Sequence, residues 1–224
     1  MKLFVITSRI PFPLDKGDKL RIYHQIKELS KHHKIYMCAI KSPLSKEHKI
    51  SREVLNEFCE EVYFINQSLL LTLFSLIKCF FNSLPFQTAI FTEFKAKKRV
   101  NYIIDKIQPD HIYCQLTRAA EYVKYRKEIK TIDYMDVFSK GMERRAFKSN
   151  MFIKWFYKWE SLKQKNYEKS IFEMFNKHSI ISEEDKQQLQ GRYIEREQVK
   201  HKAFDKIEDI LSKMDTGPSS EIAE

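Results

Sequence analysis

Glycine, proline and closely spaced cysteine are all scarce in this sequence. Its 224 residues include four glycines and six prolines, too few for the many tight turns of a β-sandwich or a loop-rich protein. The cysteines lie too far apart for a C-x-x-C pair or a common zinc site, so we expect four reduced thiols in a cytoplasmic protein. They are Cys38, Cys59, Cys79 and Cys114. A mixed or helix-rich fold with one sizeable core fits this composition.

Long apolar runs and several enzyme signatures are also missing. The apolar run near the N-terminus is shorter than the core of a signal peptide. The longest apolar stretch, 68–84, is short and contains Lys78 and Asn82, which argues against a transmembrane helix. No G-x-x-x-x-G-K-[ST], G-x-S-x-G or H-E-x-x-H segment occurs, so P-loop enzymes, serine hydrolases and zincins have no support. The histidines follow no ligand spacing, and we expect no metal site.

What the sequence does have is basic charge and aromatic side chains. The formal net charge is +10 at pH 7, and aromatic residues make up 13% of the chain. A basic surface attracts nucleic acid, anionic lipid, or phosphorylated sugars and nucleotides. Charge alone does not distinguish these partners, and the absence of a recognised motif leads us to expect no nucleic-acid partner.

Short apolar segments alternate with amphipathic ones along the first 190 residues. This alternation predicts βαβ units and a doubly wound parallel sheet of Rossmann-like type. Residues 191–224 differ, with a charged amphipathic helix over 191–214 and a tail that is disordered by composition. We predict strands over 3–6, 34–40, 62–65, 112–116, 131–137 and 179–182, and helices over 18–31, 54–59, 68–84, 93–108, 119–127 and 139–177, the last of these long or once broken.

The loop after the first predicted strand carries the strongest local feature, Pro11-x-Pro13-x-x-x-Gly17-Asp18-x-x-Arg21. Glycine lets the backbone approach a ligand closely, and the following helix N-terminus, with Asp18 as its N-cap, suits a phosphate or carboxylate. Arg21 could offer a forked donor to an anion or a sugar hydroxyl. An ordinary strand-to-helix turn that needs one glycine gives the same pattern.

Residues 5–24, which contain this loop, resemble the opening of family 4 glycosyltransferases, in particular the sugar transferases of bacterial exopolysaccharide clusters. These proteins begin with a strand, a P-x-P-x-x-K-G-D-x-x-R loop and a first helix. Residues 133–139 are similar to the family's fifth strand with its aspartates. Residues 167–168 and 175–185 are similar to the end of its N-terminal domain. The resemblance spans residues 1–190, which we expect to be one acceptor-side domain.

The resemblance implies a GT-B fold, in which two Rossmann-like domains face each other across the active site. The reaction it implies is transfer of a hexose from a nucleoside diphosphate sugar to a lipid-linked or polysaccharide acceptor, with no cofactor. The N-terminal domain mainly binds the acceptor, and a second domain with an E-x7-E element holds the sugar nucleotide. The implied substrate-binding residues are Gly17 beside the donor phosphates or the transferred sugar, Arg21 near the acceptor, and Asp18 and Asp136. We expect Arg21→Ala to spare folding and to harm acceptor use.

The sequence departs from this family pattern at two points, and it contains one literal match that we reject as the donor motif. Full members are nearly twice as long, so we expect an incomplete catalyst. Many relatives have a histidine after the fourth strand, where this chain has Gln115-Leu-Thr-Arg118, and no catalytic base is named. An E-x7-E does occur at Glu160 and Glu168, but it lies before the sixth predicted strand, and we interpret it as a solvated charged face. The alternative function is a non-catalytic fragment or split-enzyme subunit that binds a membrane or a donor-binding partner.

Aromatic and basic residues alternate over 147–169. Ten lysines and arginines face four glutamates between residues 140 and 177. Such a helix can lie on an anionic membrane, which suits a family that uses lipid-linked acceptors at the inner membrane face. It can equally pack its rings on the sheet and leave its lysines in water. The apolar stretch 69–81 has the same two interpretations, core helix or membrane-dipping surface. The membrane-facing candidates are Trp155, Phe156, Lys158 and Trp159.

Overall fold

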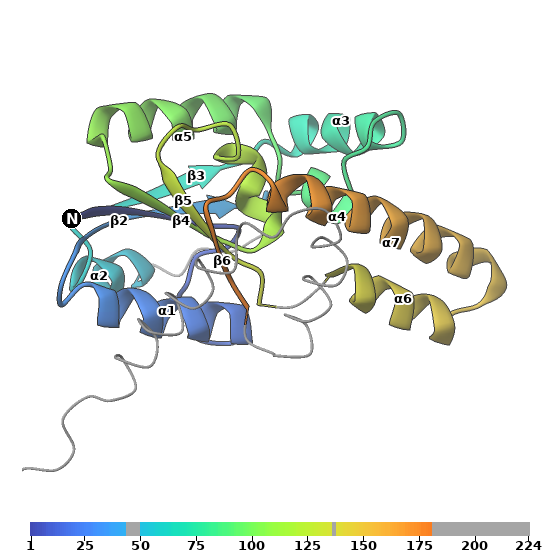
Figure 1. Cartoon of the computed structure of the whole chain (residues 1–224), viewed down its shortest axis with the longest axis horizontal. Coiled ribbons are helices and arrows are strands. Elements are labelled where there is room, and N and C mark those ends of the chain that lie inside the picture. Colours follow the sequence, from blue (N-terminus) through green and yellow to red (C-terminus); the bar gives the residue numbers. More distant parts are fainter. Residues whose placement is uncertain (44–49, 136–137, 181–224) are drawn as a thin grey trace, which may run out of the picture.

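A six-stranded sheet forms the centre of the molecule, with helices on both of its faces (Figure 1). The structure is a computed structural model, and it describes residues 1–43, 50–135 and 138–180. The strands are β1 Lys2–Thr7, β2 Lys34–Lys41, β3 Glu61–Asn66, β4 His111–Gln115, β5 Ile129–Asp133 and β6 Lys177–Ser179. Every neighbouring pair is parallel, in the order β3-β2-β1-β4-β5-β6. This confirms the predicted α/β, Rossmann-like sheet.

All six predicted strands are present, although two of them end elsewhere than expected. The sequence pattern continues the fifth strand to residue 137, but β5 ends at Asp133. Met135 has a left-handed φ of 58°, which strand geometry does not allow. The sixth strand begins at Lys177 and ends at Ser179, two to three residues earlier than predicted.

The helices confirm most of the predicted segments and correct three of them. The segment 139–177 forms two helices, 68–84 forms one shorter helix, and 119–127 is replaced by an earlier 3-10 helix. The helix predicted over 191–214 and the tail lie outside the described residues. The bounds are α1 Gly17–Leu29, α2 Ser51–Asn56, α3 Leu69–Cys79, α4 Phe86–Ala89, α5 Phe94–Ile107, the 3-10 helix η1 Thr117–Tyr122, α6 Phe138–Lys148 and α7 Met151–Phe172.

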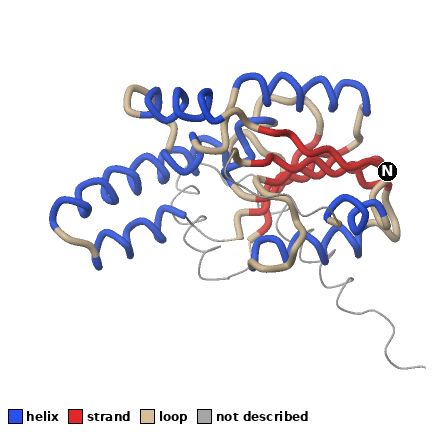
Figure 2. Tube along the Cα trace, turned by 180° about the vertical axis from the view of Figure 1, so that it is seen from behind, coloured by secondary structure: helices blue, strands red, loops and turns tan. Residues whose placement is uncertain are grey.

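The helices form two layers around the sheet and one projection from it. In Figure 1, α1 and α2 lie below the sheet and α5 lies above it, with α3 continuing the upper layer beyond the strands. The pair α6 and α7 extends away from the sheet as a helical hairpin, as the reverse view in Figure 2 also shows. α7 then returns the chain to the sheet at β6. The carboxyl ends of the strands therefore face the base of this hairpin.

Apolar side chains fill both spaces between the sheet and its helices. In β1, Leu3 and Val5 belong to the core between the sheet and α1, whereas Phe4 and Ile6 belong to the core between the sheet and α5. A strand that is apolar on both faces is typical of the centre of a parallel sheet. α5 buries Ala96, Val100, Ile103, Ile104 and Ile107, a helical spacing of three and four residues. Each of these valine and isoleucine side chains contributes about 1.5–3 kcal/mol when fully buried.

The two glutamates of the E-x7-E segment are buried, so the interpretation of a solvated charged face is wrong. Glu160 and Glu168 lie two turns apart on α7 and are 1% and 0% exposed. Glu160 accepts the backbone N–H groups of Phe86 and Gln87 at 2.9 and 3.0 Å, in the first turn of α4. Glu168 accepts the backbone N–H of Ser139 at 3.1 Å and its hydroxyl at 2.8 Å, in the first turn of α6. Each carboxylate thus satisfies the free N–H groups of a neighbouring helix.

Candidate functional site

The carboxyl ends of β1 and β4 meet at the point where the strand order changes direction. From β1 the chain proceeds to β2 and β3 on one side, and from β4 to β5 and β6 on the other. The connections that leave these two strands diverge, and ligands of open α/β sheets bind in the crevice between them. The residues that follow β1 and β4 are therefore the candidates for a binding site. They are the loop 8–16 with the first turn of α1, and the segment 115–118.

Gly17 is the first residue of α1, and the space beside it is open. A Cβ atom built on Gly17 would meet no described atom within 4 Å, and the backbone there is not left-handed. The chain's own packing and backbone conformation therefore do not require glycine at this position. A ligand group could use the same space to approach the N–H groups at the start of α1.

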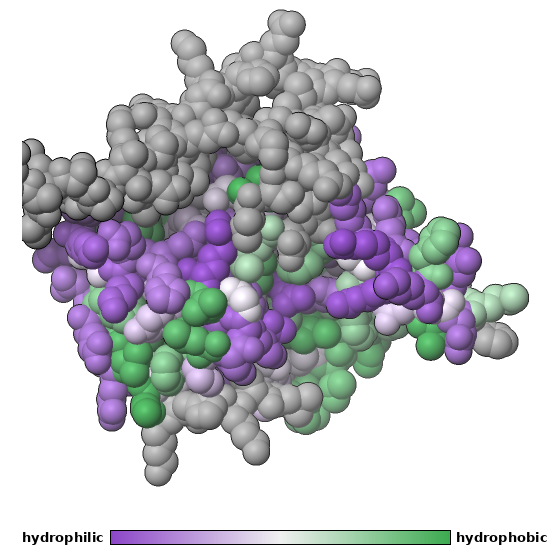
Figure 3. All heavy atoms as spheres, turned by 90° about the horizontal axis from the view of Figure 1, so that it is seen from below, coloured by the Kyte–Doolittle hydropathy of each residue, from purple (hydrophilic) through white to green (hydrophobic). Residues whose placement is uncertain are grey.

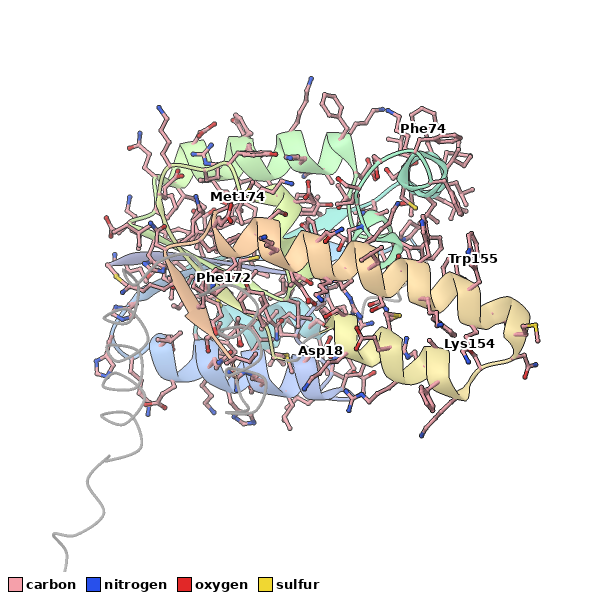
Figure 4. All side chains as sticks on the ribbon, turned by 45° about the vertical axis from the view of Figure 1, so that its right-hand side comes forward. Asp18, Phe74, Lys154, Trp155, Phe172 and Met174 are labelled. Carbon is pink, nitrogen blue, oxygen red and sulfur yellow. The ribbon has the colours of Figure 1, made fainter. Side chains whose placement is uncertain are left out.

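Asp18 holds the start of α1 against the loop and against β4. Its carboxylate binds the guanidinium of Arg9 at 2.7 Å, and its backbone carbonyl accepts the side-chain amide of Gln115 at 2.6 Å. The sequence predicts Asp18 as the N-cap of this helix, but that prediction is wrong. The helix begins at Gly17 and its N-cap is Lys16, so Asp18 lies inside the first turn. Figure 4 shows Asp18 where the start of α1 approaches the start of α6.

Arg21 is engaged by a buried carboxylate at the end of β5. Its Nε and Nη2 atoms donate to Asp133 at 2.9 and 3.4 Å. Asp133 is fully buried and also accepts the hydroxyl of Tyr113 at 3.0 Å and the amide of Gln25 at 3.4 Å. Burial lowers the pKa of Arg21, but the charge and hydrogen bond of Asp133 outweigh it and raise that pKa. Burial first, and then Asp133, raise the pKa of Tyr113 well above its usual value, so this phenol stays a donor.

Arg118 enters the same region from η1. Its guanidinium lies over the rings of Phe138 and Phe91, 4.7 and 5.5 Å from their centroids, and Nη2 donates to the side-chain oxygen of Gln87 at 3.0 Å. Its Nε is buried and has no hydrogen-bond partner among the described residues. The pKa of Arg118 is lowered to about 10, mainly by burial and also by the positive charges of Arg9 and Arg145, which the negative charge of Asp18 partly offsets.

Three of the predicted substrate-binding residues thus lie together, on the first two turns of α1. Gly17, Asp18 and Arg21 adjoin the carboxyl ends of β1, β4 and β5, and their role in binding substrate stays a prediction. The fourth, Asp136, lies outside the described residues. Sequence reasoning missed Arg9 and noted residues 115–118 only as the place where a histidine is absent. The signal that could have identified them is their position at the ends of the first and fourth predicted strands.

The aromatic candidates of α7 stack on one another and on neighbouring helices. Trp155 is 70% exposed and stacks on Trp159, which in turn stacks on Phe80 with 5.6 Å between ring centroids. Phe156 contacts the edge of Phe86 in α4. Lys158 is exposed. These rings therefore join α7 to α3 and α4, and they leave one indole facing solvent.

The interpretation of 69–81 as a core helix is wrong for most of α3. Of its residues, only Thr72 and Cys79 are buried. Figure 4 shows Phe74 of α3 and Trp155 of α7 pointing outward from the same end of the molecule, and Figure 3 shows hydrophobic side chains protruding among hydrophilic ones where α6 and α7 project. We define the α3–α7 apolar surface by its exposed residues Leu70, Leu73, Phe74, Ile77, Phe80, Phe81 and Trp155.

Lysines surround this apolar surface. Residues 69–92 contain no aspartate or glutamate, and 151–165 contain only the buried Glu160. Lys78 lies 4.6 Å from the centroid of Phe74, and Lys163 lies 4.1 Å from that of Trp159. No helix in the described part of the chain is both long and apolar enough to cross a membrane.

The remaining reactive groups of the described chain form no second centre. A pocket of about 450 Å³ lies at the opposite, amino-terminal edge of the sheet, lined by residues that include Lys2, His33 and Asp110. No three metal-ligating side chains gather in the part of the chain that the structure describes. All four cysteines are free and buried, and burial raises the pKa of Cys38 and of Cys59 to about 12, which makes them poor nucleophiles.

Comparison with known proteins gives structural likeness that is only distant. No protein-family model and no curated protein matches the sequence. Among solved structures, UGT2 of Phytolacca americana, complexed with UDP-2fluoro-glucose and pterostilbene, is similar at a TM-score of 0.39 and 9% sequence identity. The match covers 67% of this chain and 35% of the plant protein, so the chain spans about a third of that protein's length. A likeness this distant has no bearing on substrate or activity.

Proposed function

We propose that this chain supplies the acceptor side of a GT-B glycosyltransferase, which transfers a hexose from a nucleoside diphosphate sugar to a lipid-linked or polysaccharide acceptor. One observation carries the proposal. The loop with the P-x-P-x-x-x-G-D-x-x-R pattern leads from β1 into α1 at the switch point of a Rossmann-type sheet, beside the end of β4. In such sheets this is where ligands bind.

The chemistry of this loop suits a sugar or a phosphate. Gly17 leaves room beside the first N–H groups of α1, where the positive end of the helix dipole lies. Arg9 fixes Asp18 on one side and Asp133 fixes Arg21 on the other, so the polar groups around the open space are held before any ligand arrives. Groups that are fixed in advance lose little freedom when a substrate binds.

We infer that a second domain, on the same polypeptide or on a separate subunit, holds most of the sugar nucleotide. The E-x7-E element of α7 consists of Glu160 and Glu168, and both carboxylates are occupied by the N-termini of α4 and α6. They are therefore not available to a donor sugar. A non-catalytic subunit that pairs with a donor-binding partner is the alternative, and it is favoured if no assembly of this chain with such a partner transfers sugar.

Isothermal calorimetry with a panel of sugar nucleotides tests this division of labour. We expect the chain by itself to bind each of them with a dissociation constant weaker than about 1 mM, because most of the contacts lie in the other domain. Micromolar binding of any sugar nucleotide would show that this domain already contains a complete donor site.

A matched pair of glycine variants tests the position of the site itself. An added methyl group at Gly17 or at Gly141 meets no described atom within 4 Å, so both substitutions should fold normally. In the enzyme assembled with its donor-binding domain, we expect Gly17→Ala to lower sugar transfer about tenfold or more, because the methyl group displaces the reacting groups. Gly141→Ala, within α6, should leave transfer unchanged. Equal turnover of the two variants would contradict the proposed site.

We further propose that the protein is cytoplasmic and binds peripherally to the inner face of an anionic membrane. The α3–α7 apolar surface with its surrounding lysines supports this, since exposed apolar patches of this kind mark interaction surfaces and lysines favour anionic lipid. Such a position would bring a lipid-linked acceptor close to the carboxyl edge of the sheet.

A further inference from the structure

Three guanidinium groups, those of Arg9, Arg118 and Arg145, lie near one another beside the switch point, and Arg9 forms the ion pair with Asp18 at 2.7 Å. Arg118 is close enough for Arg9, Asp18 and Arg145 each to shift its pKa. Arg145 is exposed and lies two helical turns after Phe138, the residue whose ring supports Arg118, so both residues share a face of α6. The region therefore carries an excess of positive charge around the start of α1.

Arg118 differs from the other part-buried arginines of the described chain in having no acidic partner. Arg21 is paired with Asp133 at 2.9 Å, and Arg126 is paired with Asp105 and Glu128 at 2.7 and 2.5 Å. Arg118 makes no ion pair with a described carboxylate and donates only to the neutral amide of Gln87. Removing a cation from water without an opposite charge is costly, so the fold retains an electrostatic deficit at this position that an anion would remove.

We propose that Arg118, together with Arg9 and Arg145, binds a phosphate or diphosphate group at the carboxyl ends of β1 and β4. A guanidinium matches phosphate oxygens with two parallel N–H donors, and its weak hydration makes it the preferred partner of phosphate at part-buried sites. Three such groups, of which one is paired with Asp18, favour an anion with a charge of about −2, as phosphate and diphosphate carry. The free N–H groups at the start of α1 lie beside the same space.

The phosphate can come from two sources with the same chemistry. It can belong to the diphosphate of the sugar nucleotide, or to the diphosphate that links an acceptor to its lipid. Either assignment rests on the proposed sugar transfer, whereas binding of the anion itself does not. Inorganic pyrophosphate is therefore the first probe. UDP and farnesyl diphosphate are the second and third, because one carries a nucleoside and the other an isoprenoid chain.

The decisive measurement is calorimetric titration of the chain with pyrophosphate at about 0.15 M salt, where surface attraction is largely screened. We expect Arg118→Gln to weaken binding at least about tenfold, the equivalent of one lost charge-assisted contact, and Arg118→Lys to weaken it less because the charge remains. Arg52→Gln is the matched control, because Arg52 also lies over a ring, 4.5 Å from the centroid of Phe64, but is remote in the chain and in the sheet order. Its affinity should equal that of the wild type.

Each remaining outcome has a definite meaning. If Arg118→Gln fails to fold, the exposed Arg145→Gln replaces it and should weaken pyrophosphate binding at least about threefold. Tighter binding of farnesyl diphosphate than of UDP assigns the site to the acceptor, and the reverse order assigns it to the donor. Pyrophosphate affinity that is unchanged in both arginine variants, or that falls equally in Arg52→Gln, overturns the site. Sugar transfer by the assembled enzyme would survive that result, so the two proposals fail separately.

Discussion

At the scale of single residues, the ion pair between Arg21 and Asp133 changes what a substitution at Arg21 would report. Asp133 is fully buried, and Arg21 is its charged partner. The expectation that Arg21→Ala spares folding is therefore revised, because the substitution leaves a buried carboxylate without its counter-charge. Reduced acceptor use in that variant would be inseparable from reduced stability.

We predict that Arg21→Ala lowers the free energy of unfolding by about 3 kcal/mol, the cost of breaking one partner out of a buried pair. Urea denaturation measures it. Asp105→Asn provides the control, since Asp105 pairs with Arg126 at the surface with 63% of its side chain exposed, and we expect a loss below about 1 kcal/mol. Similar losses for both variants would show that Asp133 is stabilised mainly by Tyr113 and Gln25.

At the scale of elements, α7 organises two other helices through its buried glutamates. Glu160 binds the start of α4 and Glu168 binds the start of α6, and α7 reaches both because the two side chains lie two turns apart on one face. Burial raises the pKa of Glu160, and the N–H groups of Gln87 and Phe86 partly oppose this effect. The same spacing that resembles a catalytic motif is here used to hold helices in place.

This arrangement predicts a crossed pattern of local opening. Glu160→Ala should speed amide hydrogen exchange at Phe86 and Gln87 and leave Ser139 protected, whereas Glu168→Ala should do the reverse. Each variant should also lose about 1.5–3 kcal/mol of stability, the value of hydrogen bonds to a charged group. Exchange that rises at both helix starts in either variant would mean that α4, α6 and α7 open as one unit.

The sequence predicts the sheet well and the surfaces poorly. Strand positions follow from apolar runs such as Leu3 to Ile6, whose burial is decided by local composition. The burial of Glu160 and the exposure of Phe74 depend on which helix packs against which, and a helical periodicity carries no information about that choice. Arg118 could be placed at the sheet edge but not assigned its rings, because Phe91 and Phe138 come from distant segments.

At the scale of the whole molecule, many exposed apolar side chains belong to α3, α6 and α7, and between residues 140 and 177 ten lysines and arginines stand against four glutamates. The net charge of +10 supports association with anions in general, while the exposed rings add a term that charge alone lacks. The exposed rings distinguish adsorption on an anionic lipid surface from binding of small anions, because only adsorption on lipid requires the rings.

We predict that the chain sediments with vesicles that contain phosphatidylglycerol and not with vesicles of phosphatidylcholine alone. The double variant Phe74→Ser, Trp155→Ser should lower the partition coefficient about tenfold or more, since two exposed rings no longer insert. Tyr125→Ser is the control, because Tyr125 is 71% exposed and precedes β5 at the other edge of the sheet. Equal vesicle binding by the double variant and the wild type would contradict this prediction, because membrane binding would then depend on the lysines alone.

A short series of contacts connects the α3–α7 apolar surface, at Trp159, to Arg118 in the crevice at the carboxyl ends of the strands. Trp159 stacks on the exposed Trp155. The next residue along the chain, Glu160, accepts the backbone N–H of Gln87, and the side-chain oxygen of Gln87 accepts a hydrogen bond from Arg118. One carboxylate and one amide thus separate a solvent-facing indole from the arginine at the crevice. A tilt of α7 against a lipid surface would be transmitted through two hydrogen bonds to the orientation of that arginine.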